Sequence, residues 1–558
     1  MADLEADGLS SGTGVHTILH GHDYSEKGTA GNGSNNGITS DVVDESFGKG
    51  GHDAWAPRNE HHRGTNDGTG FVGLFKKTIW HGGSVYDAWL NATAAQIDDH
   101  LVVDTAAALL QVGQVILTMP TSYAQMGFTW AVIFHIFYFA TGIYTCYLLT
   151  RLYIEYRVRK EKEGVDFKKH VIQYHEVLGS LVGMWAQRIT LFFNIITVGA
   201  ISVVQIIACA SDAYYLNPHL PKRTWTAVFG AMSLLVVVLP TMHNFRVWSL
   251  IGIVTTTYTA WYLFGASISN GQVDHRFFGD QMQAAPDQII TTNLEFLFVS
   301  SSMTSLQVPD VKHSGPINLE TFFVGSTNLL FASGGHAITI EIMHAMWRPV
   351  RYKYVYVFTC LYVWSITIPH CLAVYWAFGD ELLHQNNAFA VVPPSNFRSA
   401  AIVMMIIHQA VAFGLYSMPL YFIWEKLLRV HRSRWYIRTL SRLPVALFLW
   451  FLAFAFPFFG PFNSLIGALI VSVSTFIIPS VAYIIVFWTP TARQNEAEKP
   501  GILRRFVGFR GILGVNFFVV VVILATGTGL GSWANIKNII SQIETFGVFE
   551  KCYQCPKK

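Results

Sequence analysis

Nine stretches of this chain contain no Asp, Glu, Lys or Arg and are long enough to cross a lipid bilayer, which takes about 20 residues of helix. The charge-free runs are 105–150, 189–211, 224–245, 247–273, 321–340, 354–379, 399–424, 443–492 and 511–536. The first run and the run 443–492 can each hold two helices joined by a tight turn. Because lipid offers backbone groups no water, each span should be an α-helix. We therefore expect an all-α membrane protein with eleven transmembrane helices.

Composition excludes several functional classes. Charged residues make up 13% of the 558 residues, whereas an average soluble domain is about 25% charged. A soluble enzyme, a nucleic-acid-binding protein and a secreted disulfide scaffold are therefore excluded. The chain has no His-Glu-x-x-His metalloprotease motif and no nucleotide-binding loop. We expect a membrane protein that is not an enzyme, requires no cofactor or metal, binds no nucleic acid and is surrounded by lipid.

The basic residues predict the orientation in the membrane. With a cytosolic N-terminus, the cytosolic segments are 1–104, 151–188, 341–353, 425–442, 493–510 and the surroundings of Arg246. These segments hold 29 of the 38 Lys and Arg residues. The positive-inside rule favours this orientation, and an odd number of spans then places the C-terminus outside.

The expected domain organisation has three parts. Residues 1–78 are polar and of low complexity, which is typical of a disordered cytosolic tail. Residues 79–540 form the transmembrane domain, which contains a long exoplasmic loop at 274–309. Residues 541–558 form an exoplasmic C-terminal tail, in which Cys552 and Cys555 are compatible with a disulfide, a redox motif or half of a zinc site.

Two predicted spans contain residues that should interrupt a helix near the middle of the membrane. Pro120 in the first span removes a backbone donor, and Gly334 and Gly335 in the sixth are weak helix formers. Interrupted helices at corresponding positions of two halves are typical of secondary transporters, which bind substrate there. The candidate substrate-binding residues are Gln111, Gln114, Thr118, Ser122, Tyr123, Gln205, Ser333, Gly334, Gly335 and His336.

Polar residues inside spans are costly in hydrocarbon and often functional. His336 lies beside the glycine interruption, and histidine changes its charge near physiological pH. We expect it to face the Thr118–Ser122 interruption and to take part in proton coupling. Glu341 and His408 are the other candidates for proton coupling. The two histidines are also compatible with a structural role in helix–helix packing, and Glu341 with a residue that ends its span at the cytosolic interface.

The chain resembles the plant auxin influx carriers, the AUX/LAX family of the amino acid/auxin permease group. The similarity extends from about Ile79 to Cys555. It rests on blocks that include His81-Gly82-Gly83-Ser84-Val85, Gly334-Gly335-His336-Ala337, Glu341-Ile342-Met343-His344-Ala345-Met346-Trp347 and Cys552-Tyr553-Gln554-Cys555. The resemblance implies a LeuT-like core of two inverted five-helix repeats plus one extra helix, and proton-coupled uptake. The chain departs from the family pattern at Leu110, Thr121 and Tyr123, and the segments 98–109 and 274–309 look like insertions.

These observations predict a plasma-membrane symporter that imports indole-3-acetic acid with protons. One alternative is a proton-coupled amino acid permease of the same fold. The first-span interruption has no acidic residue to bind an ammonium group, which favours a ligand without an amine. The other alternative is a receptor that binds the ligand without transporting it.

Overall fold

The computed structural model describes residues 115–165, 167, 171–239, 245–272, 311–346, 349–385, 387–456, 459–498 and 501–546. Gln111, Gln114, the segments 1–78, 98–109 and 274–309, and Cys552 and Cys555 lie outside these residues, so the predictions made for them stay predictions. Within the described ranges all regular secondary structure is helical, as the sequence predicts.

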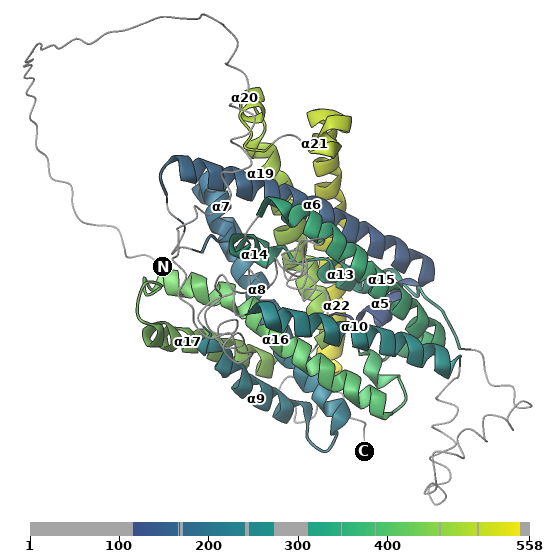
Figure 1. Ribbon diagram of the computed structural model, residues 1–558. Coiled ribbons are helices and arrows are strands. Elements are labelled where there is room, and N and C mark those ends of the chain that lie inside the picture. Colours follow the sequence, from purple (N-terminus) through teal and green to yellow (C-terminus); the bar gives the residue numbers. More distant parts are fainter. Residues whose placement is uncertain are drawn as a thin grey trace, which may run out of the picture. The chain divides into compact units, whose positions relative to one another are not determined.

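The longer helices account for most of the predicted spans (Figure 1). They are α6 (Phe128–Lys162), α8 (Met184–Leu216), α10 (Phe245–Asn270), α15 (Tyr352–Phe378), α16 (Asn396–Leu427), α17 (Trp435–Ala455), α21 (Ile502–Ile523) and α22 (Leu530–Phe546). The shorter ones are α5 (Met119–Met126), α7 (Tyr174–Leu181), α9 (Lys222–Ser233), α13 (Leu319–Ala332), α14 (Thr339–Ala345), α18 (Phe459–Ile466), α19 (Ile478–Val486) and α20 (Pro490–Gln494). Wider π-helical turns join α18 to α19 at Gly467–Ile477 and α21 to α22 at Leu524–Gly529.

Among the described residues, seven helical stretches are long and apolar enough to cross a membrane. They are Phe128–Lys162, Met184–Leu216, Pro349–Leu383, Asn396–Leu427, Trp435–Ala455, Gly460–Val486 and Arg504–Ser541. The run 443–492 divides between α17 and α18, which confirms that it holds more than one helix.

Gly127 divides the run 105–150 by ending α5 and preceding α6. Its φ of 77° lies in the region that side chains rarely adopt. A Cβ at this position would lie 2.5 Å from the carbonyl oxygen of Gly315. The close approach of the 311–318 segment therefore requires glycine at this turn.

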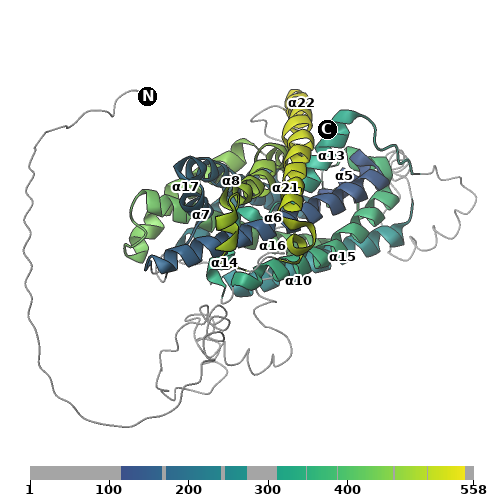
Figure 2. The same ribbon diagram turned by 90° about the horizontal axis from the view of Figure 1, so that it is seen from above.

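The helices pack so that two interrupted segments lie inside the bundle. Helix α8 packs against α16, and α10 lies beside both α15 and α16 (Figure 1). Helix α13 contacts α5, α18 and α22, and Figure 2 shows it next to the yellow α22. Ser122 of α5 and Ser326, Thr327 and Asn328 of α13 are thus buried within the bundle.

Two helix ends differ from the predicted boundaries. Helix α8 continues to Leu216, five residues beyond the predicted run 189–211, and this extension brings Asp212 into the helix. Helix α22 continues to Phe546, ten residues beyond the predicted run 511–536, and includes Lys537. Each predicted run ends at a charged residue. The helix continues past that residue, because a single charged residue does not end a helix when it is buried or lies at the aqueous end.

Candidate functional site

The interruption predicted in the sixth span is present. Helix α13 ends at Ala332, a short 3₁₀ turn occupies His336–Ile338, and α14 begins at Thr339. Ser333, Gly334 and the intervening backbone up to His336 are buried. A Cβ on Gly334 would lie 2.1 Å from Cγ1 of Val471, so the glycine allows the π-helical segment to pack directly against the interruption.

The first span is also non-helical over Val115–Thr118, directly before α5. Residues Val115–Thr118 form turns, and Pro120 lies in the first turn of α5, where its missing N–H costs no hydrogen bond. Pro120 therefore helps to begin a helix. The half of the span that precedes Val115 lies outside the described residues.

Each carbonyl group of this non-helical segment has a hydrogen-bond donor. Val115 O accepts from the backbone of Met119 at 3.0 Å. Ile116 O lies 3.0 Å from Nε2 of His370, whose Nδ1 lies 3.0 Å from Ile366 O, and Leu117 O accepts from the backbone of Ala388 at 2.9 Å. Since unpaired carbonyls in a membrane interior cost several kcal/mol each, donors from α15 and from the 387–390 connection stabilise the interruption.

Asn328 of α13 links the two interrupted spans. Its Nδ2 lies 2.8 Å from Oγ of Ser122 and 3.2 Å from the carbonyl oxygen of Thr118. Thr118 returns a bond from its Oγ1 to Oδ1 of Asn328 at 3.3 Å. Two predicted site residues therefore meet the sixth span through an amide that the sequence analysis did not select.

His336 contacts α6 and not α5, which differs from its predicted orientation. Its Nε2 lies 3.1 Å from the carbonyl oxygen of Gly142 and 3.0 Å from Oγ1 of Thr145. A carbonyl oxygen only accepts, so Nε2 carries the proton. Its Nδ1 is buried and has no hydrogen-bond partner in the described part of the chain. The ring also packs edge-on against Tyr356 at 5.7 Å between centroids.

His408 has the same arrangement in a different place. Its Nδ1 lies 2.8 Å from Oγ1 of Thr256 and 3.2 Å from the carbonyl oxygen of Gly252, both on α10. Its Nε2 is buried without a hydrogen-bond partner among the residues that the structure describes. His336 and His408 thus each have one buried ring nitrogen without a hydrogen-bond partner among the described residues.

The other predicted residues lie at separate points of the bundle. Tyr123 donates to or accepts from Nδ1 of His135 at 3.0 Å, and His135 reaches Thr367 of α15 through Nε2 at 3.2 Å. Gln205 is fully buried in α8. Ser333 bonds to the carbonyl oxygen of Leu330 at 2.8 Å, an ordinary contact within its own helix.

Glu341 is buried in α14, at the end of the molecule that carries most of the ion pairs. The charges of Lys426 and Glu176 interact electrostatically with the Glu341 carboxyl group. Lys426 and Glu176 also form an ion pair with each other at 2.8 Å. Glu341 therefore lies apart from the contacts of His336 and belongs to the basic end of the bundle.

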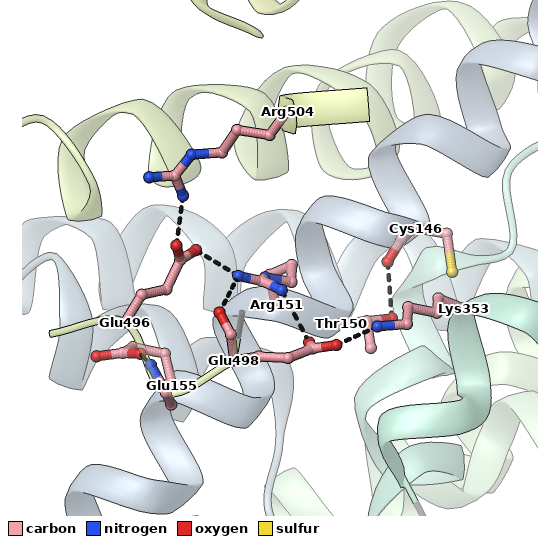
Figure 3. Close-up of polar contacts among 9 residues, drawn as sticks. Cys146, Thr150, Arg151, Glu155, Lys353, Glu496, Glu498 and Arg504 are labelled. Carbon is pink, nitrogen blue, oxygen red and sulfur yellow. Dashed lines mark hydrogen bonds and ion pairs between the residues drawn. The ribbon is translucent and has the colours of Figure 1, made fainter. Parts of the chain in front are cut away.

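A buried ion-pair network joins three elements at that same end (Figure 3). Arg151 of α6 lies 2.7 Å from Oε1 of Glu496 and 3.1 Å from Oε2 of Glu498. Arg504 of α21 forms a second ion pair with Glu496, and Lys353 of α15 forms a second ion pair with Glu498. These bonds tie α6, α15 and the connection between α20 and α21 together, and removing one partner of a buried pair typically costs about 3–5 kcal/mol.

Sequence reasoning did not select Asn328, His370, Asp212 or Arg151. Asn328 and His370 were detectable as polar residues within charge-free runs. Asp212 directly follows such a run and is followed by Ala213, Tyr214 and Tyr215, so the apolar pattern continued past it. No metal-ligand cluster of His, Cys, Asp or Glu occurs among the described residues.

Comparisons with known proteins define the family. The family model described as "Transmembrane amino acid transporter protein" matches residues 108–524. "Auxin transporter-like protein 3" of Medicago truncatula is 45% identical over 486 residues, which cover 87% of this chain and 93% of that protein. "Auxin transporter protein 1" of Arabidopsis thaliana is 44% identical over 499 residues, covering 89% and 91%. The chain belongs to the AUX/LAX family. It is therefore a multi-pass membrane protein of a transporter family.

One solved structure similar to this AUX/LAX member is a nucleobase-cation-symport-1 family transporter in a closed conformation with bromovinylhydantoin bound. The match has a TM-score of 0.41 and 13% sequence identity, and it covers 81% of this chain and 93% of that chain.

Proposed function

We propose that this protein imports indole-3-acetic acid together with protons across the plasma membrane. The observation that carries the proposal is the interruption between α13 and α14, together with the bonds by which Asn328 of α13 joins Thr118 and Ser122 of the first span inside the bundle. The names of the relatives, which are auxin transporters at 44–45% identity, support auxin as the substrate.

The physical logic of the proposal concerns a weak acid. Indole-3-acetic acid is partly protonated in an acidic wall space and ionised in the cytosol, so its anion needs a carrier to cross lipid. The N-terminus of α5 offers a partial positive charge to a carboxylate. The aromatic side chains of the bundle offer faces to an indole ring. The candidate binding residues remain those listed from Gln111 to His336 in the sequence analysis.

Proton coupling is the finer part of the proposal. Nδ1 of His336 and Nε2 of His408, which have no hydrogen-bond partner among the described residues, can each accept a proton. A protonated imidazole attracts a carboxylate, so the two ligands would strengthen each other's binding, as reciprocal coupling requires. Glu341 is the third candidate for proton binding.

We further propose eleven spans in a LeuT-like arrangement, with two inverted repeats of five helices and one additional helix. In this arrangement α5 belongs to the first span, and α13 with α14 to the sixth. The end that carries Arg151, Lys353 and Arg504 faces the cytosol, and exposed aromatic residues such as Phe448, Phe451 and Phe517 contact lipid.

The topology makes a prediction about the two chain ends. A tag placed after Lys558 should bind antibody on intact cells, whereas a tag before Met1 should bind only after permeabilisation, because eleven spans separate the two ends. Immunofluorescence with and without detergent checks this. A C-terminal tag that is reached only after permeabilisation would show that the number of spans is even.

A proton-coupled amino acid permease is the second candidate, because the matching family model is described as an amino acid transporter. The decisive measurement is uptake of labelled indole-3-acetic acid and labelled amino acids by expressing cells. We expect uptake of the auxin, and its loss when a protonophore removes the proton gradient. Amino acid uptake without auxin uptake would support the permease, and binding without accumulation would support a receptor.

A further inference from the structure

Asp212 is a buried carboxylate that joins three parts of the bundle. It lies in the last turns of α8 and has no exposed surface. Its Oδ1 accepts from Nδ2 of Asn387 at 2.8 Å, and its Oδ2 accepts from Nε2 of Gln409 at 2.9 Å. Asn387 belongs to the connection between α15 and α16, and Gln409 belongs to α16. Burying an aspartate at such a position costs free energy unless the carboxylate is well paired, and such residues are often functional.

The hydrogen bonds around Asp212 leave one acceptor unused. Oε1 of Gln409 is buried and has no hydrogen-bond partner among the described residues. In the present arrangement two amide donors meet an ionised carboxylate. If Oδ2 takes up a proton, the Gln409 carboxamide can turn over so that the new O–H donates to Oε1. The site can therefore hold either protonation state with the same number of hydrogen bonds to Asp212.

One positive charge favours the ionised form of Asp212. Lys222 at the start of α9 interacts electrostatically with the carboxylate, and its Nζ lies 5.1 Å from the centre of the Tyr214 ring. Arg398 of α16 lies over the Tyr215 ring at 5.9 Å and donates to the carbonyl oxygen of Phe389 from Nε at 3.0 Å and from Nη2 at 2.6 Å. Cys209 and Tyr215 are the titratable neighbours on α8 itself. Burial opposes the charge of Asp212, whereas Lys222 and the two amide donors favour it.

Asn387 connects this carboxylate to the first-span interruption. The next residue, Ala388, donates its backbone N–H to Leu117 O at 2.9 Å. Asn387 also caps its own turn through Oδ1, which accepts from the backbone of Phe389 at 2.9 Å. The residue that bonds to Asp212 is therefore next in the chain to the residue that bonds to Leu117 O. A change in the bond between Asp212 and Asn387 should alter the bond between Ala388 and Leu117.

We propose that Asp212 is a proton-binding site that controls how firmly the segment Asn387–Ala390 is held on the first-span interruption. Hydrogen bonds to an ionised acceptor are roughly twice as strong as neutral ones. The ionised carboxylate therefore holds Asn387 tightly, and the protonated acid holds it weakly. In the topology proposed above, this end of α8 faces outside, so external acid would loosen the segment and expose the interrupted span. The transport consequence rests on the proposed function, whereas the proton-dependent change of the segment does not.

The test measures hydrogen–deuterium exchange of the segment 385–392 in the purified full-length protein. We expect lower protection at about pH 5.5 than at about pH 7.5, after correction for the intrinsic exchange rate. Asp212→Asn imitates the protonated acid, because its Oδ1 can accept from Asn387 while its Nδ2 donates to Oε1 of Gln409. The variant should show the low protection at both pH values.

Glu381→Gln is the matched control, because Glu381 is a carboxylate at the same end of the bundle whose side chain has no hydrogen-bond or ion-pair partner among the described residues. It should keep the pH dependence of the parent. Equal protection of the parent at both pH values, or the same pH dependence in Asp212→Asn as in the parent, would overturn the proposal. Neither result depends on a substrate, so failure here is distinct from a failure of auxin uptake.

Transport gives a second readout. If auxin is the substrate, Asp212→Asn should raise uptake at neutral external pH towards the value of the parent in acid, which flattens the pH profile. Unchanged uptake and pH profile in a variant with normal surface expression would show that the segment does not limit access to the site.

Discussion

Gly334→Ala is expected to remove most uptake, and Val471→Ala in the same chain is expected to restore much of it. A Cβ on residue 334 would lie 2.1 Å from Cγ1 of Val471, far inside the contact distance of two carbon atoms. Valine is stiff about its first side-chain torsion, so the backbone of the interruption must move instead. Inserting a methyl group into a packed core typically costs about 1–3 kcal/mol.

Uptake of labelled indole-3-acetic acid, normalised to surface expression, measures this effect. Gly265→Ala is the matched control, because a Cβ on that α10 glycine would meet no atom within 4 Å. It should leave uptake unchanged. The explanation by steric overlap is wrong if Gly334→Ala transports like the parent, or if the double variant is no better than Gly334→Ala alone.

The helices were largely predictable because the membrane imposes a simple rule on their composition. A charge-free run of sufficient length marks a helix, and the predicted runs 354–379 and 399–424 differ from α15 and α16 by only a few residues at each end. The turn at Gly127 was harder to locate, since its need for a positive φ arises from the neighbouring Gly315. Contacts between distant segments leave no local pattern in a sequence.

The interruption of the sixth span was predictable from Gly334 and Gly335, but the direction of His336 was not. Spacing along one helix does not specify which neighbour a side chain meets, and the ring bonds to Gly142 of α6. The hydrogen bond to the first span is made instead by Asn328 of α13, which precedes His336 in the chain. A polar residue at an interface between two helices looks the same in a sequence as one that binds a ligand.

Buried charges were the part least accessible to sequence reasoning. Asp212 and Arg151 each lie at the end of a charge-free run, where a charged residue ordinarily marks the surface of the membrane. In the folded chain both are buried, because α8 continues past Asp212 and α6 continues past Arg151. Their partners, Asn387 and Glu496, are distant in the sequence.

His336→Gln is expected to permit auxin binding but to lose most of the pH dependence of uptake. The glutamine amide can still donate to the carbonyl oxygen of Gly142, as Nε2 does now, so local packing should survive. It cannot take up a proton, whereas the unpartnered Nδ1 of His336 can. A proton gradient of one pH unit supplies about tenfold accumulation per coupled proton, and the variant should lose that factor.

Accumulation of labelled auxin at a series of external pH values measures the loss, and His384→Gln, at an exposed histidine of the same chain, is the control. His336→Ala should lower uptake further, since it leaves the Gly142 carbonyl and Thr145 without their ring partner. If His336→Gln accumulates auxin with the pH profile of the parent, the coupled proton binds elsewhere. His408 would then be the next residue to substitute. Like Nδ1 of His336, its Nε2 is buried and has no hydrogen-bond partner among the described residues.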